Sequence, residues 1–152
     1  MMALKVLLTV VCLLLPVVMG QLPVQSCKSG VIPTNLIIEG CEKAPCTIVN
    51  GKILKFLAEF VNPVATKTLT AKVIPRVAGL VIGYELPEEH RDGCNKLTNA
   101  KCPLDANQRV EAAGDILVES PISNVKVNIE FQLHSDAGVA LCFKIDAKVV
   151  KS

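Results

Sequence analysis

The sequence predicts an all-β protein in which two sheets, built from about seven strands, pack as a β-sandwich. Two observations support this prediction. Hydrophobic and polar residues alternate along several segments, which is the period expected of strands with one buried face. Six cysteines also follow a hydrophobic N-terminal leader, which indicates a disulfide-bonded protein made for an oxidising compartment. Short strands in a disulfide-bonded secreted chain are typical of a sandwich.

The N-terminal segment 1–20 is predicted to be a signal peptide, with a cleavage site before Gln21. Its hydrophobic run is too short, and is interrupted at Pro16, to span a bilayer of roughly 30 Å as a helix. Cys12 lies inside the leader and should leave with it. We therefore expect residues 21–152 to form one secreted domain.

The sequence argues against nucleic-acid binding and against N-glycosylation. The net charge is +2, the basic residues are scattered, and the chain has no tryptophan and one tyrosine, so a nucleic-acid interface is not expected. No asparagine lies in an Asn-x-Ser/Thr sequon, so we expect no N-glycosylation and no sorting route that reads an N-linked sugar. An extracellular location is therefore expected, with the lysosomal lumen as the disfavoured alternative.

The first four predicted strands differ in how regular their alternation is. Residues 31–38 and 80–86 alternate weakly, whereas 54–60 and 71–77 alternate clearly. Pro75 cannot donate a backbone hydrogen bond, so we expect its strand to be an edge strand or a bulged one.

The C-terminal part of the chain supplies the best strand pattern. A less regular segment at 108–119 is followed by 125–133, where Val, Ile, Phe and Leu alternate with Lys, Asn, Glu and Gln. Residues 141–149 repeat this pattern, and the turn 134–138 between them suits a β-hairpin. We find no convincing helical segment and expect no helix.

Catalytic chemistry is not indicated. The chain has two histidines, His90 and His134, and neither lies in a nucleophile or metal-binding motif. His90 could ligate zinc together with Cys94 and Cys102, but zinc requires thiolates and this compartment favours disulfides, so no metal or other cofactor is expected. An enzyme would require His90 to be buried beside an acidic partner. We expect a protein that is not an enzyme.

The six cysteines allow several connectivities in principle. The simplest pattern joins near neighbours in two small loops and uses one long bridge to tie the two ends together. On a chain-entropy model, a bridge that closes a loop of more than 100 residues stabilises the fold by roughly 4–5 kcal/mol. The positions are Cys27, Cys41, Cys46, Cys94, Cys102 and Cys142.

These cysteines and three short segments resemble the ML-domain (MD-2-related lipid-recognition) family, which includes the soluble Niemann-Pick type C sterol carrier and the mite group two allergens. The segments are Asp92-Gly93-Cys94 with Cys102-Pro103-Leu104, Ile129-Glu130-Phe131-Gln132-Leu133, and Leu141-Cys142. The resemblance implies that 21–152 is a single ML domain, an immunoglobulin-like sandwich with a lipid pocket between its sheets. It also implies the disulfides Cys27–Cys142, Cys41–Cys46 and Cys94–Cys102.

The resemblance further implies which residues bind the ligand. Aligned on the family's segments, Tyr84 lies at the pocket mouth, and Val118 and Ile122 match two other lining positions. The same residues would fill the core of any closed sandwich, so the resemblance is what favours a pocket. The inward faces of the predicted strands would supply the rest of the lining: Leu54, Phe56, Ala58, Phe60, Val73, Val77, Val127, Ile129, Phe131, Phe143 and Ile145.

Two departures from the sterol carriers widen the expected range of ligands. A charged loop at 83–90 replaces a proline-rich loop, and Ile122 replaces an aromatic residue. Fatty acids and other amphiphiles are therefore candidates beside sterols. Lys55, Lys72 and Arg76 could hold a carboxylate or phosphate head group if they reach the mouth; an ordinary solvated face is the alternative.

We expect a monomeric, secreted lipid-binding and transfer protein that holds a sterol, a long-chain fatty acid or a similar lipid and hands it to a membrane or receptor. Its role would be sterol transport or the carriage of lipid chemical signals. The alternative is an immune lipid-recognition protein that presents bacterial lipid to a receptor. A basic patch at the pocket mouth would favour that alternative.

Overall fold

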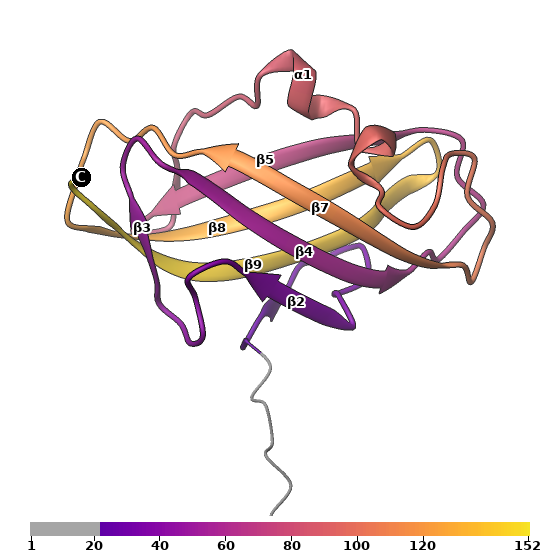
Figure 1. Ribbon diagram of the computed structural model, residues 1–152, viewed down its shortest axis with the longest axis horizontal. Helices are drawn as coiled ribbons and strands as arrows, with labels where there is room; N and C mark the ends of the chain where they lie inside the picture. The colour runs from indigo at the N-terminus through magenta and orange to yellow at the C-terminus, as the bar shows by residue number, and fades with distance from the viewer. Residues whose placement is uncertain (1–21) are drawn as a thin grey trace, which may run out of the picture.

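The computed structural model describes residues 22–152, and these residues form two facing sheets that cross at an angle (Figure 1). The predicted signal peptide lies outside the described residues. In the part of the chain that is described, no helix is both long and hydrophobic enough to cross a membrane.

The larger sheet has six strands in the order β1-β9-β8-β5-β6, with β3 paired in parallel to β9. The smaller sheet has the order β2-β4-β7. The strands of the larger sheet are β1 (Gln25–Ser26), β3 (Cys46–Val49), β5 (Leu69–Val77), β6 (Leu80–Val81), β8 (Val125–Ser135) and β9 (Gly138–Val150). Those of the smaller sheet are β2 (Asn35–Ile38), β4 (Ile53–Val61) and β7 (Arg109–Leu117).

The predicted two-sheet sandwich is confirmed, and all seven predicted strands are present. The segment expected at 80–86 contains a strand of only two residues, β6. The expectation of no helix was wrong, because a four-residue helix α1 (Glu88–Arg91) and a 3₁₀ turn η1 (Cys94–Lys96) follow β6. Both lie in the loop that crosses from the larger sheet to the smaller one (Figure 1).

The strand of Pro75 was expected to be an edge strand or a bulged one, but β5 lies between β8 and the two-residue β6, so Pro75 is one strand in from the edge. It stands opposite Ile129 of β8, whereas on its outer side β5 pairs with β6 only through Arg76 and Val77. Proline has no amide hydrogen to donate. It is tolerated here because an amide hydrogen at this position would have few hydrogen-bond partners. The Pro75 carbonyl accepts a 2.8 Å hydrogen bond from the Ile82 amide, which fixes the chain as it leaves β6.

The core lies between the sheets and centres on three phenylalanines. The ring of Phe56 on β4 lies 4.8 Å from Phe131 on β8 and 5.9 Å from Phe143 on β9, measured between centroids. Phe131 and Phe143 are register partners whose rings stack at 5.0 Å. Burying such side chains stabilises the fold by about 1.5–3 kcal/mol each. The aromatic cluster therefore joins the two sheets at their centre.

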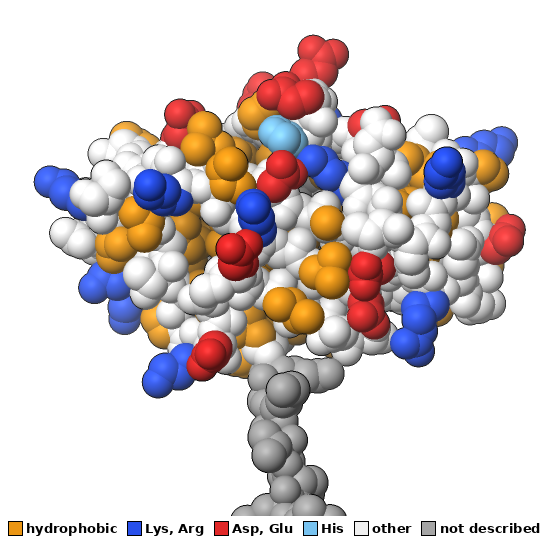
Figure 2. Space-filling view, viewed as in Figure 1, with side chains coloured by type: hydrophobic (Ala, Val, Ile, Leu, Met, Phe, Trp, Pro, Cys, Tyr) orange, Lys and Arg blue, Asp and Glu red, His pale blue; other side chains and the backbone are white. Residues whose placement is uncertain are grey.

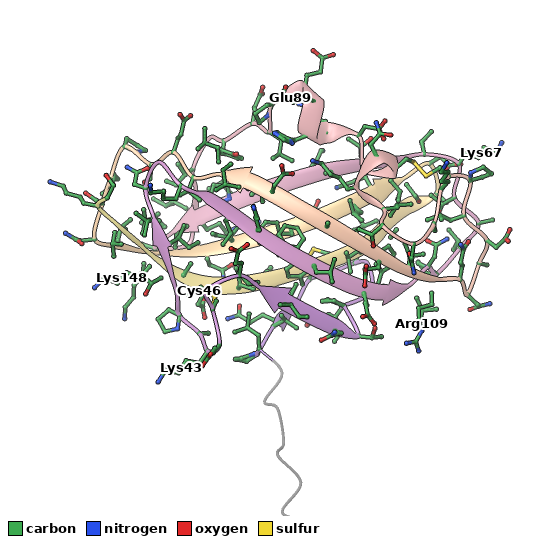
Figure 3. The ribbon with its side chains drawn as sticks, in the orientation of Figure 1. Lys43, Cys46, Lys67, Glu89, Arg109 and Lys148 are labelled. Atoms are coloured by element: carbon green, nitrogen blue, oxygen red, sulfur yellow. A yellow bond between two sulfur atoms is a disulfide. The ribbon has the colours of Figure 1, made fainter. Side chains whose placement is uncertain are left out.

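The charged side chains largely face outward. Lys43, Lys67, Glu89, Arg109 and Lys148 are all exposed and point away from the sandwich interior (Figure 3). The space between the sheets is therefore left to hydrophobic groups.

One acidic side chain on the outer face of β8 is nevertheless buried. Glu130 is 6% exposed, and its carboxylate lies 2.5 Å from the Arg76 guanidinium and 3.8 Å from the Lys144 ammonium. The Gln132 side chain donates a further hydrogen bond to it. Burial of a carboxylate is costly unless it is paired, so these partners are what allow Glu130 to lie under neighbouring side chains.

Three disulfides fasten the loops and ends of the fold. They join Cys27 to Cys142, Cys41 to Cys46, and Cys94 to Cys102, at sequence separations of 115, 5 and 8. This is the pairing that the family resemblance implies. The long bridge ties the segment after β1 to the middle of β9.

Candidate functional site

A hydrophobic cavity of about 150 Å³ lies between the sheets at the end where β7 stops. We call it the Tyr84 cavity. Its walls come from β5 and β8 of the larger sheet and from β4 and β7 of the smaller one. The segments that follow β6 and β7 form its rim, with Ile82, Gly83 and Tyr84 on one side and 117–121 on the other.

Tyr84 links the two sides of this rim. Its hydroxyl donates a 3.3 Å hydrogen bond to the carbonyl of Leu117, the last residue of β7. Burial, with the nearby negative charge of Glu119, raises the pKa of Tyr84 above its ordinary value of 10.0. The phenol therefore keeps its proton at physiological pH and remains a donor. This hydrogen bond therefore joins the two sides of the rim.

A second, smaller cavity of about 50 Å³ adjoins the first beneath α1, and we call it the His90 cavity. Val73, Ile116 and Phe131 line both cavities, so the two are neighbours along the same space between the sheets. The loop 82–90 contributes to both, since its first residues border the Tyr84 cavity while Leu86 and His90 border the second.

In the wall of the His90 cavity, the Phe56 ring packs against β7 at a position where only a glycine, Gly114, leaves room for it. Phe56 and Gly114 are register partners on β4 and β7. A Cβ atom at position 114 would lie 2.1 Å from Cε1 of the Phe56 ring, which is far closer than atoms can approach. The missing side chain of Gly114 is therefore what gives the Phe56 ring its place beside β7.

Three polar side chains border the His90 cavity at its outer end. Lys96 Nζ donates to Asp115 Oδ1 at 2.7 Å and to His90 Nδ1 at 2.9 Å. The His90 ring also lies 3.5 Å from Asp115 Oδ1. The hydrogen bond from Lys96 holds the pKa of Asp115 below its ordinary value of 3.8, so Asp115 is charged at neutral pH. Figure 2 shows histidine, basic and acidic side chains together at the foot of α1.

The condition set for an enzyme, a buried His90 beside an acidic partner, is met only in part. His90 lies beside Asp115, but its side chain is 28% exposed, and Asp115 pairs with Lys96. The zinc hypothesis is wrong because Cys94 and Cys102 form a disulfide and offer no thiolate.

Most of the predicted pocket residues border one of the two cavities. Eight border the Tyr84 cavity: Leu54, Val73, Val77, Tyr84, Val118, Val127, Ile129 and Phe131. The His90 cavity is bordered by Phe56 and Phe143, together with Val73 and Phe131.

Four predicted positions lie elsewhere. Ile122 is 52% exposed and borders neither cavity; the Ser120 hydroxyl bonds both its amide and its carbonyl in a turn. Ala58, Phe60 and Ile145 are buried in the closed part of the core and border neither cavity. They support the walls and do not line the space.

The three candidate head-group cations also differ in place. Arg76 faces outward and pairs with Glu130, so it is not at the mouth. Lys55 is exposed on β4. Lys72 borders the His90 cavity from β5, opposite Gln132. Lys96 borders the His90 cavity and contacts polar partners there. The sequence did not indicate this residue as a candidate.

Several further lining residues were missed. Ile116 borders both cavities, and Leu117 and Pro121 border the mouth. A signal for the wall was present, since Ala112, Gly114 and Ile116 follow the strand period. Alanine and glycine made this run too weakly hydrophobic to be recognised as a pocket wall.

Comparison with known proteins gives a consistent result. Residues 21–149 match the family model of the ML domain. The chain is 28% identical over 130 residues to mite group 2 allergen Lep d 2 of Lepidoglyphus destructor, covering 86% of this chain and 88% of the allergen. It is 25% identical over 114 residues to NPC intracellular cholesterol transporter 2 of Danio rerio, covering 74% of each.

A solved structure shares the fold. The crystal structure of a Niemann-Pick type C2 protein from the Japanese carpenter ant superposes with a TM-score of 0.72 at 20% sequence identity, covering 84% of this chain and 98% of that one.

Proposed function

The chain belongs to the ML-domain family of lipid-binding proteins, and we propose on this premise that it is a secreted carrier. It binds one hydrophobic lipid between its two sheets and releases it without chemical change. The observation that carries this proposal is the Tyr84 cavity, a hydrophobic space that reaches the surface beside Tyr84. Removing apolar groups from water stabilises a bound lipid by about 0.8 kcal/mol per buried CH₂.

Binding a lipid requires the walls of the space to move apart. The Tyr84 cavity of about 150 Å³ is smaller than the roughly 300–1,000 Å³ of most small-molecule pockets. The neighbouring His90 cavity offers further room once the side chains around Phe131 shift. The ligand site is therefore the space made of both cavities, opened when the hydrogen bond between Tyr84 and Leu117 breaks.

A sterol or a long-chain amphiphile suits such a site. The lining fixes shape and length because it offers few polar groups. Among the described residues that border the Tyr84 cavity, Glu119 alone carries a charge, and that charge is negative. The mouth therefore lacks the basic patch that would favour an immune protein that binds anionic bacterial lipids. The cholesterol transporters among the relatives support a sterol as one natural ligand.

Exposed hydrophobic residues beside the mouth would bring the carrier to a membrane or a receptor. Leu117 itself borders the Tyr84 cavity, and its register partner Ile53 is 58% exposed. Leu80 and Val81 directly precede the rim residue Ile82, and Ile122 follows the rim residue Pro121. Figure 2 shows hydrophobic side chains gathered at this end of the molecule. This surface, made of Ile53, Leu80, Val81, Leu117 and Ile122, is named the mouth rim.

The disulfides and the leader support a secreted location for the proposed carrier. Three disulfides indicate an extracellular or lumenal location. The hydrophobic leader supports secretion, and the lack of a glycosylation sequon disfavours sugar-dependent sorting. The proposed carrier acts as an extracellular monomer.

A matched pair of valine substitutions tests the site. Val77→Glu places a charge in the lining of the Tyr84 cavity, whereas Val61→Glu places the same charge on β4 outside both cavities. We expect the first variant to lose binding of radiolabelled cholesterol or oleate and the second to keep it, at equal thermal stability. Equal binding by both folded variants would place the ligand elsewhere.

A further inference from the structure

The polar end of the His90 cavity has the features of a head-group site. Most of its lining is hydrophobic, but Lys96 of η1, His90 of α1 and Asp115 of β7 meet at its outer end. The Asp115 side chain is 45% exposed while that of Lys96 is 19% exposed. The cluster therefore touches both solvent and the hydrophobic space, as the polar end of an amphiphile must.

The cluster can bind one more polar group. A lysine ammonium has three donors, of which Asp115 and His90 take two. A carboxylate accepts several hydrogen bonds through its two oxygens, and Asp115 Oδ1 accepts the one from Lys96. A donor and an acceptor thus lie side by side at the end of the cavity.

This arrangement discriminates between head groups by charge. A hydroxyl has one donor and can accept as well, so it can accept from Lys96 and donate to Asp115 together. A carboxylate would be attracted by Lys96 and repelled by Asp115, and the ion pair as a whole offers it no net charge. Two unit charges at 4 Å interact strongly enough, even in water, to change an affinity by roughly fivefold.

We propose that the lipid carried by this protein bears a neutral hydroxyl head group, which Lys96 and Asp115 bind at the outer end of the His90 cavity. The hydrophobic part of the lipid extends past Phe131 toward the Tyr84 cavity. This inference rests on the proposed carrier function and adds a ligand class to it, because it favours sterols and fatty alcohols over fatty acids.

Two pairs of lipids that differ in the head group test the inference. One pair is cholesterol and cholesteryl hemisuccinate, and the other is oleyl alcohol and oleate. Dissociation constants are measured at pH 8, where carboxylic acids are ionised, by displacement of one fluorescent sterol. In each protein we take the ratio of the acid to the alcohol dissociation constant and compare the ratio of each variant with that of the wild type. The wild-type ratio alone would not suffice, because it also reflects how each lipid dissolves in water.

Two substitutions in the cluster should move this ratio in opposite directions. Asp115→Asn keeps an acceptor for Lys96 and removes the repulsion, so the preference for the alcohol should fall roughly fivefold. Lys96→Met removes the attraction and keeps the repulsion, so the preference should rise by a similar factor. Glu119→Gln, at the Tyr84 cavity, should leave the ratio unchanged. Circular dichroism and thermal melts confirm that each variant is folded.

The outcomes separate the inference from the function on which it rests. Opposite shifts for Asp115→Asn and Lys96→Met, in whichever lipid pair binds, support a hydroxyl at this cluster. An unchanged ratio in both folded variants overturns it, and so does a ratio that responds to Glu119→Gln alone, which would put the head group at the Tyr84 mouth. Failure of the wild type to bind any of the four lipids would overturn the carrier function itself.

Discussion

The Phe56 ring on β4 lies in the space that a side chain at Gly114 of β7 would occupy. The ring also contacts Phe131 and Phe143 of the opposite sheet, so one glycine fixes an aromatic contact between the sheets. Phe56 and Gly114 both border the His90 cavity. The stability of the core and the shape of the proposed ligand site therefore depend on the same pair.

Gly114→Ala should force the Phe56 ring out of its position, because the new methyl group would lie 2.1 Å from a ring carbon. Overpacking of this kind costs about 1–3 kcal/mol of unfolding free energy. Urea denaturation measures the loss. Gly83→Ala is the matched control, since no atom lies within 4 Å of a Cβ at that position. Equal midpoints for the two variants would show that the ring relaxes without cost.

Tyr84→Phe should make lipid exchange faster without much effect on equilibrium affinity. The change removes the hydrogen bond from Tyr84 to Leu117 that closes the mouth, and a hydrogen bond of this kind contributes about 0.5–1.5 kcal/mol. Association and dissociation rates should rise together by about twofold to tenfold in stopped-flow measurements with a fluorescent sterol. Unchanged rates would mean that the lipid does not pass this hydrogen bond.

Leu80→Ser should slow the transfer of bound lipid to phospholipid vesicles while leaving affinity unchanged. Leu80 is 72% exposed on the mouth rim, and its contact with a bilayer would be lost. Burial of a leucine side chain contributes about 1.5–3 kcal/mol, so a rate decrease of fivefold or more is expected. Ile37→Ser, on β2 and 55% exposed, is the control. A carrier that releases lipid through water would show equal rates for both variants.

Arg76→Met should destabilise the fold because it leaves the buried carboxylate of Glu130 with Lys144 at 3.8 Å as its remaining cationic partner. Loss of a partner from a buried charge costs several kcal/mol, and the partial exposure of Arg76 reduces this to about 1–3 kcal/mol. Lys144→Met should cost less in the same denaturation experiment. A larger loss of stability in Lys144→Met than in Arg76→Met would make Lys144 the main partner of Glu130.

The stability should fall as the pH drops below about 6.5, because of His134. Burial, and then the charge of Lys72, lowers the pKa of His134 from its ordinary value of 6.5. A histidine with a lowered pKa binds fewer protons when folded than when unfolded, so its contribution is favourable above pH 6.5 and is lost as the pH falls through the folded pKa.

His134→Gln should therefore flatten the melting temperature between about pH 5 and 7. Asp115→Asn should keep that slope and flatten the curve only below 3.8, because the pKa of Asp115 is lowered from that value by Lys96. A wild-type melting temperature that does not change between pH 5 and 7 would contradict the assignment to His134.

The strands were predictable where their two faces differ in chemistry. Residues 125–133 and 141–149 alternate strictly, and β8 and β9 form there with one buried face. Strands β1 and β3 have two and four residues, which is too short for a periodic signal. The helix α1 has a proline before it and acidic residues in its first turn, but four residues do not show a helical period.

The candidate site was predictable where it lies on regular strands. Leu54, Val73 and Ile129 follow from alternation and do border the Tyr84 cavity. Ile122 does not border the cavity and lies in an irregular segment with the Ser120 turn, where strand alternation gives no prediction. The contact of Lys96 with Asp115 joins residues 19 apart on a 3₁₀ turn and a strand, which only the tertiary fold brings together.

The proposed function requires the space between the two sheets to hold one lipid molecule. Native mass spectrometry tests it most directly, on the full chain expressed in a secretory host with its three disulfides formed, after incubation with cholesterol and oleate in competition. We expect a one-to-one lipid adduct in the wild type and in Val61→Glu, and no adduct in folded Val77→Glu. A folded, fully oxidised wild-type protein that carries neither lipid would contradict it.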